Sequence, residues 1–221
     1  MRLVLASESP SRRRALDLLG IAYEIHPSAI DEKSIRDADP AALTKKLAEA
    51  KAWKVASTFE DAIVVAGDAV VVKDEKIFEK PRDLAQAVEF LGELSGSSFR
   101  FVTSLAVLRA DTGKMLSTVE ASEITFRPLT VREIRDYVGR HPVVQFAGAF
   151  DGDGVLRFAD SICGSCNIFT AMPVSKLAVS SGNQASMFNS IRIRGNAALP
   201  APAPARSQSH YPHRSTNRHP Y

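Results

Sequence analysis

The first twenty residues alternate apolar and polar segments, and the pattern predicts a strand, a short turn and a helix. Residues 3–5 are consecutive apolar residues that predict a short buried strand. In "LASESPSRRRALDLLG", Ser9 is placed to cap a helix, and Pro10 falls at the first helical position, which tolerates proline. Leu16 lies on the apolar face of this helix, and Gly20 is placed to end it.

Strand and helix patterns continue to alternate over the following residues. Thr130 and Glu133 have the spacing of a capping box, which predicts a helix that begins there. The pattern predicts a strand that runs into a loop over 22–32, helices over 39–58, 83–96 and 130–140, and two long strands over 99–110 and 114–129 joined by a turn at 111–113.

The first part of "AIVVAGDAVVVKDEKIF", residues 62–72, is apolar except for an acidic residue near its centre. Residues 63–66 and 70–72 are apolar, and Gly67 and Asp68 interrupt them. A carboxylate buried among these residues would cost several kcal/mol without a partner. Asp68 therefore has two interpretations: it caps a turn or bulge after Gly67, or it is a functional acid held in the interior.

The last patterned segment, residues 147–179, mixes glycine-rich loops, short strands and a final helix. Together the elements predict an α/β protein with a mixed sheet, organised as one cooperative unit with a cleft. There are no internal repeats.

Length and composition limit the classes of protein to consider. The chain has 221 residues, of which 45% are hydrophobic and 24% charged, as in soluble globular proteins. No apolar run reaches the ~18–20 residues that span a bilayer, and the run after Arg2 is too short for a signal peptide. We therefore expect a cytoplasmic protein without a membrane partner.

The cysteines give little indication of function. Cys163 and Cys166 form a single Cys-x-x-Cys, and His26 and His141 do not supply a second ligand pair at the spacing of a structural zinc site. A redox role would favour a strand-to-helix context, which "SICGSCNIF" does not clearly provide. We interpret the pair as structural.

The positive charge of the chain is concentrated at its C-terminus. Residues 182–221 contain five Arg and no Lys, Asp or Glu, which leaves 23 basic and 25 acidic residues in the remainder. The segment is rich in proline and lacks apolar periodicity, so we expect 1–180 to form the domain and 181–221 to be a disordered basic tail. The tail alone does not indicate a nucleic-acid partner.

Several charged residues in the domain are candidates for phosphate chemistry. Arginines 12–14 lie in the first turn of a helix, where cations cost roughly 0.3–1 kcal/mol each unless an anion binds there. Glu32 follows a predicted strand, and Lys51 and Lys80 are further cations. These charges either form salt bridges at strand ends or bind a metal ion and phosphates.

The ordered set of motifs resembles the Maf family of nucleoside triphosphate pyrophosphatases over roughly residues 3–179. The matching segments are "LASESPSRRRALDLLG", "IDE", "AEAKA", "VVAGDAVV", "EKPRD", "TFRPLT", "AGAF" and "GSCNIFTAMPVSKL". The resemblance implies a two-lobed, mixed-sheet Maf/ITPase-like fold with a central cleft. It implies hydrolysis of a nucleoside triphosphate to the monophosphate and pyrophosphate with a divalent cation, Mg²⁺ or Mn²⁺, and homodimers are common in the family.

The resemblance also implies roles for individual residues. It places the proton acceptor on Asp68 and a metal partner on Glu32, so that these two carboxylates would hold the cation. The same match implies that Lys80 is a catalytic residue that supplies a positive charge. Its implied substrate-binding residues are Ser7, Arg12, Arg13 and Lys51. Arg14 falls further round the helix, where it would be solvated.

Base preference is the least determined part of the prediction. The positions that match the specificity residues of the family are Ser11, Ala69 and Asp153, which differ from the set typical of thymidine and uridine selectivity. The acid at 153 favours a modified or non-standard nucleotide, because a carboxylate accepts hydrogen bonds from a guanine N–H edge. The alternative is a nucleotide- or nucleic-acid-binding regulator of cell division on the same fold with little turnover.

Overall fold

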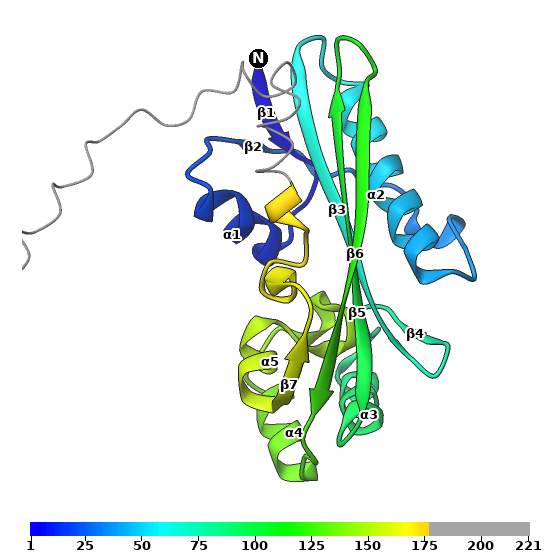
Figure 1. Cartoon of the computed structure of the whole chain (residues 1–221), viewed down its shortest axis with the longest axis vertical. Helices are drawn as coiled ribbons and strands as arrows, with labels where there is room; N and C mark the ends of the chain where they lie inside the picture. Colours follow the sequence, from blue (N-terminus) through cyan, green and yellow to red (C-terminus); the bar gives the residue numbers. More distant parts are fainter. Residues whose placement is uncertain (177–221) are drawn as a thin grey trace, which may run out of the picture.

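A seven-stranded mixed sheet extends along the whole molecule in the computed structural model, which describes residues 1–176 (Figure 1). The predicted tail, 181–221, lies outside the described residues. The strand order is β2-β1-β3-β5-β6-β7, and β4 pairs with β3. The strands are β1 (Arg2–Leu5), β2 (Glu24–Ile25), β3 (Ala62–Lys73), β4 (Lys76–Phe78), β5 (Ser98–Arg109), β6 (Met115–Phe126) and β7 (Ala159–Cys163).

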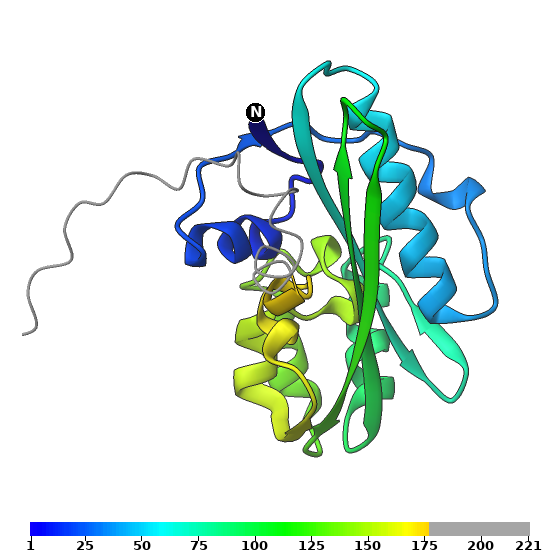
Figure 2. The same ribbon diagram turned by 45° about the horizontal axis from the view of Figure 1, so that its top comes forward.

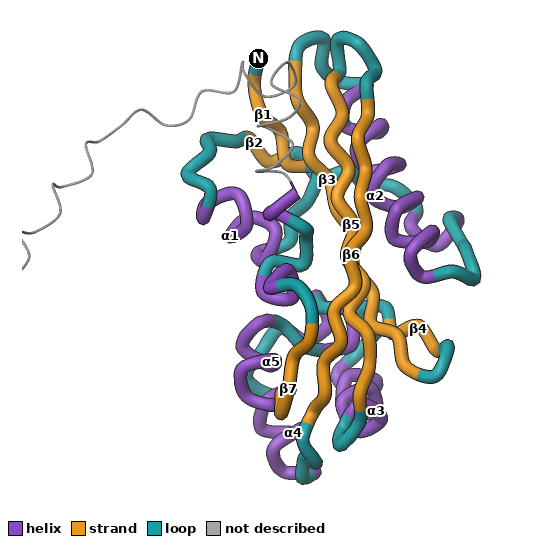
Figure 3. Tube along the Cα trace, viewed as in Figure 1, coloured by secondary structure: helices purple, strands orange, loops and turns teal. Residues whose placement is uncertain are grey.

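Helices cover this sheet and shorter helical turns border its centre (Figures 2 and 3). The α-helices are α1 (Pro10–Leu18), α2 (Pro40–Ala56), α3 (Leu84–Leu94), α4 (Val131–Val138) and α5 (Gly152–Phe158). The 3₁₀ turns are η1 (Glu32–Ser34), η2 (Val143–Gln145), η3 (Ala147–Ala149) and η4 (Cys166–Phe169).

The predicted two-lobed α/β architecture is confirmed. One lobe contains β1, β2, α1 and α2, and the other contains α3, α4, α5 and β7 (Figure 1). The long strands β3, β5 and β6, each of 12 residues, run through both lobes. Strand β1 is parallel to β2 and β3, whereas β3, β5, β6 and β7 pair antiparallel, so the sheet is mixed.

The two-residue period of β3 assigns its side chains to opposite faces of the sheet. Ala62, Val64 and Ala66 pack in a cluster that includes residues of α2, and Ile63 and Val65 pack in a cluster that includes residues of α1. Helices α1 and α2 therefore cover opposite faces of the first lobe. The same alternation directs the side chain at position 68 toward the α2 face.

The core of the second lobe is rich in aromatic side chains. Phe126 makes edge contacts with Phe99, Phe150 and Phe158 at ring separations of 4.8 to 5.7 Å. Tyr137 of α4 packs on Phe158 as well. These contacts fix α4, α5 and the segment before α5 against β5 and β6.

Helix ends agree with the sequence predictions, with one difference. Thr130 and Glu133 form the predicted capping box of α4, and Gly20 has a φ of 64° after α1. Ser9 stands at the N-cap of α1, but its side chain makes no capping hydrogen bond.

Two segments differ from the predicted pattern. Strand β3 continues through Gly67 and Asp68, so the interpretation of Asp68 as a turn residue is wrong. The segment 147–179, predicted to mix glycine-rich loops, short strands and a final helix, also contains α5 at 152–158, because Asp151 accepts a hydrogen bond from Gly154 N and caps the helix. The predicted final helix lies mostly outside the described residues.

Within residues 1–176, none of the helices has both the length and the apolar character that a membrane crossing requires.

Gly148 joins the segment before α5 to the sheet. It has a φ of 67°, its N–H donates to Glu79 O, and a Cβ there would lie 2.7 Å from Val71 Cγ2. A side chain at this position therefore requires a strained backbone and displacement of a buried strand residue.

We expect Gly148→Ala to lower the free energy of unfolding by roughly 1–3 kcal/mol. The matched control is Gly92→Ala in α3, where a Cβ meets nothing within 4 Å. That change should raise the free energy of unfolding by up to about 1 kcal/mol, because alanine favours the helix. Urea unfolding of the two variants measures both effects, and equal midpoints would contradict the packing described for Gly148.

Candidate functional site

A lysine between two carboxylates lies at the centre of the cleft. Lys51 Nζ is 2.6 Å from Asp68 Oδ1 and 2.9 Å from Glu32 Oε1. Lys51 and Asp68 are only 4% and 6% exposed, whereas the Glu32 side chain is 45% exposed. The lysine belongs to the buried stripe of α2, which includes Leu47 and Val55, and not to a solvated basic face. The buried acid therefore has the charged partner that its position requires.

Hydrogen bonds through Ser104 tie α2 to β3 beside this ion pair. Ser104 is the register partner of Asp68 across the β3–β5 ladder, and its hydroxyl donates to Thr44 O of α2 at 2.7 Å. The Asp68 N–H donates to the same hydroxyl oxygen at 3.2 Å. The backbone that carries Asp68 is thus held to the helix that carries Lys51.

Because Gly67 has no side chain, the guanidinium of Arg12 can approach β3 closely. A Cβ at Gly67 would lie 2.8 Å from Ser104 O and 3.3 Å from Arg12 Nε. Arg12, on the first turn of α1, is 7% exposed and donates to Ser7 Oγ at 3.2 Å and Ala171 O at 3.3 Å. Its position therefore depends on the absence of a side chain at 67.

The other two arginines of α1 differ in exposure. Arg13 is partly buried, and its Nε has no hydrogen-bond partner among the described residues. Arg14 is exposed, as its position on the helix predicts. A buried donor without an acceptor carries a cost of desolvation.

Burial and the neighbouring charges shift the pKa values of Arg12 and Glu32 in the cleft. Burial lowers the pKa of Arg12, and the negative charges of Asp68 and Glu32 oppose this shift, so the guanidinium stays charged. Partial burial acts to raise the pKa of Glu32, but Lys51, Lys80 and Arg12 outweigh it and leave the pKa lowered. Glu32 is therefore ionised at neutral pH.

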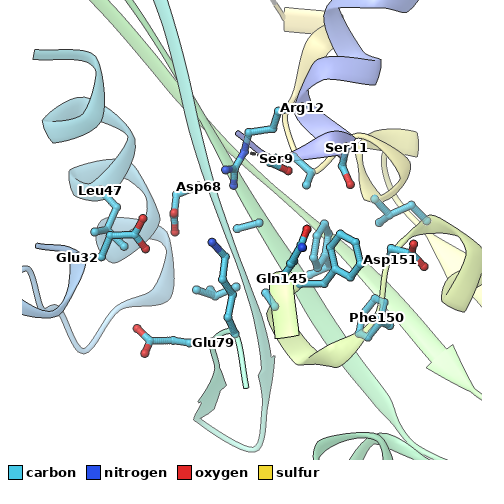
Figure 4. A pocket seen from close by; sticks show the side chains of 18 of the residues that line it. Ser9, Ser11, Arg12, Glu32, Leu47, Asp68, Glu79, Gln145, Phe150 and Asp151 are labelled. Atoms are coloured by element: carbon cyan, nitrogen blue, oxygen red, sulfur yellow. Dashed lines mark hydrogen bonds between the residues drawn. The ribbon is translucent and has the colours of Figure 1, made fainter. Parts of the chain in front are cut away.

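A cavity of about 250 Å³ opens beside Asp68 (Figure 4). Part of its wall is aromatic, formed by Phe101, Phe146 and Phe150, which come from β5 and the segment before α5. Asp151 lies at the side of the cavity opposite Glu32. A flat apolar ring with a polar edge matches this combination of aromatic and charged lining.

A second cavity, of about 860 Å³, continues from the first toward the turn between β1 and α1. Ser7, Arg13 and Lys51 line it together with the turn residues. Both cavities are lined by Ser9, Arg12, Glu32, Lys80 and Gln145. The second cavity therefore offers cations and the N-terminal end of α1, which together favour an anionic group.

Nine of the ten residues selected from the sequence line one or both cavities. Ser11 and Ala69 line the first, and Ser7, Arg13 and Lys51 line the second. Asp153 is exposed on α5 and lines neither of these cavities, whereas its neighbour Asp151 does.

Sequence reasoning missed the rim of the first cavity. Arg36 donates to Glu79 Oε1 at 3.2 Å, which links the loop after η1 to the segment that carries Lys80. Gln145 lies at the junction of the two cavities. These are charged or polar loop residues without periodic spacing, so the sequence carries no signal that separates them from solvated residues.

The two carboxylates have the donor chemistry of a divalent cation site. Glu32 lines both cavities and Asp68 lines the first, and Mg²⁺ typically binds through one or two carboxylates together with substrate phosphates. Lys51 contacts one oxygen of each carboxylate. The residues present therefore fit such a cation.

Comparisons with known proteins identify the family of the chain. Residues 2–180 match the family described as Maf-like protein. The chain is 36% identical to a dTTP/UTP pyrophosphatase of Desulforamulus reducens, over 80% of this chain and 93% of the relative. It is 40% identical to a dTTP/UTP pyrophosphatase of Moorella thermoacetica, over 72% and 82%.

Two further proteins that are similar to this chain are named for other substrates. The chain is 35% identical to a 7-methyl-GTP pyrophosphatase of Nitrosococcus oceani, over 69% of this chain and 77% of the relative. A crystal structure of a nucleoside-triphosphatase, dITP/XTP pyrophosphatase, from Mycobacterium abscessus is similar at 14% identity and a TM-score of 0.35, over 57% of this chain and 73% of that chain.

We expect Lys51→Met to lower the free energy of unfolding by roughly 3–5 kcal/mol, because it leaves the buried Asp68 carboxylate without its charged partner. The matched control is Lys45→Met, on the exposed part of α2, where the ion pair with Glu49 spans 4.0 Å. That change should cost under about 0.5 kcal/mol.

A double variant separates charge from packing. Replacing both Lys51 and Asp68 with apolar residues should recover part of the loss, because no buried charge then remains. Equal losses for Lys51→Met and Lys45→Met in urea unfolding would contradict the central role of the buried pair.

Proposed function

The chain belongs to the Maf-like protein family, and from this premise we propose that it is a nucleoside triphosphate pyrophosphatase. It hydrolyses a nucleoside triphosphate to the monophosphate and pyrophosphate. The observation that carries the proposal is the buried Asp68 carboxylate, which lines the aromatic cavity and lies 2.6 Å from Lys51, a residue that lines the cationic cavity.

The two cavities suit the two parts of a nucleotide. The base and sugar occupy the cavity lined by Phe101, Phe146 and Phe150, and the phosphates occupy the cavity lined by the β1–α1 turn. Arg12, Arg13, Lys51, Lys80 and Ser7 bind phosphate oxygens. The lining of the second cavity by Ser7, Arg13 and Lys51 supports this assignment.

Hydrolysis requires an attacking water and a proton acceptor beside the phosphate chain. Asp68 accepts a proton from the water as its oxygen adds to a phosphorus of the anhydride that joins the monophosphate to pyrophosphate. The P–O bond of that anhydride then breaks, and the cations stabilise the charge on the departing oxygen. Lys51 holds the Asp68 carboxylate toward the junction of the cavities.

Glu32 and Asp68 would hold a divalent cation, Mg²⁺ or Mn²⁺, together with the phosphates. When bound, the ion supplies Lewis-acid polarisation of the phosphate oxygens. The ionised state of Glu32, maintained by Lys51 and Lys80, keeps an oxygen donor available at this position.

We propose a modified or non-standard nucleoside triphosphate as substrate. Ser11 and Ala69 line the base cavity, and Asp151 adds a carboxylate to its wall. A carboxylate can accept hydrogen bonds from the N–H edge of a guanine-type base, and the small side chains at 11 and 69 leave space. Asp153, the acid selected from the sequence, is exposed and lines neither cavity, so the carboxylate in this proposal is that of Asp151. A cytoplasmic homodimer remains part of the proposal on the family resemblance.

Asp68→Asn tests the catalytic assignment. The change preserves the shape of the side chain but removes the proton acceptor, so pyrophosphate release should fall by at least about 100-fold. The measurement is pyrophosphate release from thymidine, uridine, cytidine, guanosine and 7-methylguanosine triphosphates with Mg²⁺ or Mn²⁺. Asp160→Asn, an exposed carboxylate of β7, is the control and should retain full activity.

Two outcomes would oppose the proposal. Full activity in the Asp68→Asn protein would remove Asp68 from catalysis. Tight binding of a triphosphate by the wild-type protein without release of pyrophosphate from any substrate would favour the alternative, a nucleotide-binding regulator.

Arg12→Ala tests the phosphate cavity. Loss of charge-assisted hydrogen bonds should weaken triphosphate binding by roughly 10–100-fold and monophosphate binding much less. Arg14→Ala, an exposed arginine of the same helix turn, is the control and should change neither. Both arginine changes are made in the Asp68→Asn protein, and calorimetric titration measures its affinity for triphosphate and for monophosphate. Equal losses of affinity for the two ligands in Arg12→Ala would contradict the assignment.

A further inference from the structure

A second group of metal-ligating side chains lies away from Asp68. His141 follows α4, and Asp151 and Asp153 stand at the start of α5. One ligand atom from each of the three residues lies within 4.8 Å of the others. Asp151 lies on the side of the nucleotide cavity opposite Glu32, so this group is separate from the catalytic carboxylates (Figure 4).

Two of the three side chains are held in place by Tyr137. The Tyr137 hydroxyl donates to Asp151 Oδ1 at 2.7 Å, and Gly154 N donates to the same oxygen at 3.0 Å. The His141 ring stacks on the Tyr137 ring at a centroid distance of 4.2 Å.

This arrangement matches the outer shell of known metal sites. Carboxylates that ligate metals are themselves hydrogen-bonded, which fixes one oxygen and leaves the other for the ion. Here both donors to Asp151 engage Oδ1. The histidine backbone is also fixed, because His141 N donates to Tyr137 O and His141 O accepts from Val143 N.

The separation of the ligand atoms is close to what an ion requires. Ligand atoms at about 2.0–2.2 Å from a tetrahedral ion lie roughly 3.3–3.6 Å apart. The three atoms here lie within 4.8 Å of one another, and rotation of the exposed Asp153 side chain can bring its carboxylate closer to the other two. One imidazole and two carboxylates favour Zn²⁺ or a similar transition-metal ion over Mg²⁺, which prefers oxygen ligands alone.

We propose that His141, Asp151 and Asp153 form a binding site for a divalent transition-metal ion such as Zn²⁺. The ion joins the end of α4 to the start of α5. Because Asp151 also lines the nucleotide cavity, the ion steadies that wall of the cavity. The proposal does not depend on the catalytic assignment, since binding is measured without nucleotide.

Zinc binding to the full chain tests the proposal. His210, His213 and His219 are first replaced with Gln, and the exposed free cysteines Cys163 and Cys166 with Ser, so that their imidazoles and thiols do not compete for the ion. Excess Mg²⁺ is present to occupy the carboxylates Glu32 and Asp68. Equilibrium dialysis against Zn²⁺ should then give one tightly bound ion per chain, and nitrogen NMR should show a shift of the His141 imidazole.

Single changes in this background identify the ligands. His141→Gln and Asp153→Asn should each weaken Zn²⁺ binding at least tenfold, and Zn²⁺ should no longer raise their unfolding temperature. The control is His26→Gln, a histidine beside Glu24 on the β2 side of the molecule, which should bind Zn²⁺ normally.

Asp153 is exposed, so the folding of Asp153→Asn should be unaffected, which keeps the test valid if His141→Gln unfolds. Unchanged Zn²⁺ affinity in either variant, or an unshifted His141 imidazole in the presence of Zn²⁺, would overturn the proposal.

Discussion

The ammonium group of Lys51, buried between two carboxylates, is the interaction on which the other features of the cleft depend. Removing Lys51 and Asp68 from water is costly, and the cost is offset only when their contact is short and the surrounding polar groups are hydrogen-bonded. This requirement explains the hydroxyl of Ser104 between α2 and β3 and the close approach of Arg12 over Gly67. Several elements thus meet at one position because charge must be neutralised there.

Asp68 lies near the middle of β3, which runs through both lobes, so each lobe contributes a different part of the proposed substrate recognition. The first lobe contributes the β1–α1 turn and the arginines of α1, whose backbone and side chains face the cationic cavity. The second lobe contributes the aromatic wall, and Phe150 in that wall also packs on Phe126 in the lobe's core. A ring that lines the cavity is therefore held by the same contacts that stabilise the second lobe.

The sequence predicted most elements and the central residues of the cleft, but not their arrangement. Period-two and helical spacing located the strands and helices, and a lone acid among valines indicated Asp68. Whether Asp68 lay in a turn or a strand was not determined by local pattern, because the partner that stabilises it, Lys51, is 17 residues away. Helix α5 was missed because its cap, Asp151, is also oriented by Tyr137 from another helix. Gln145, in the 3₁₀ turn η2, has no sequence pattern that marks it as part of the site.

The continuity of β3, β5 and β6 has a consequence for how the molecule can move. Rotation of two lobes about a hinge requires a few residues that absorb the change in backbone angles. Here, ladders of backbone hydrogen bonds cross the boundary between the lobes, so rotation would have to twist all three strands together. Adjustment to a ligand is therefore confined to the loops at the rim. The sheet itself therefore holds Asp68 of β3 and Phe101 of β5, which line the same cavity, at a fixed separation.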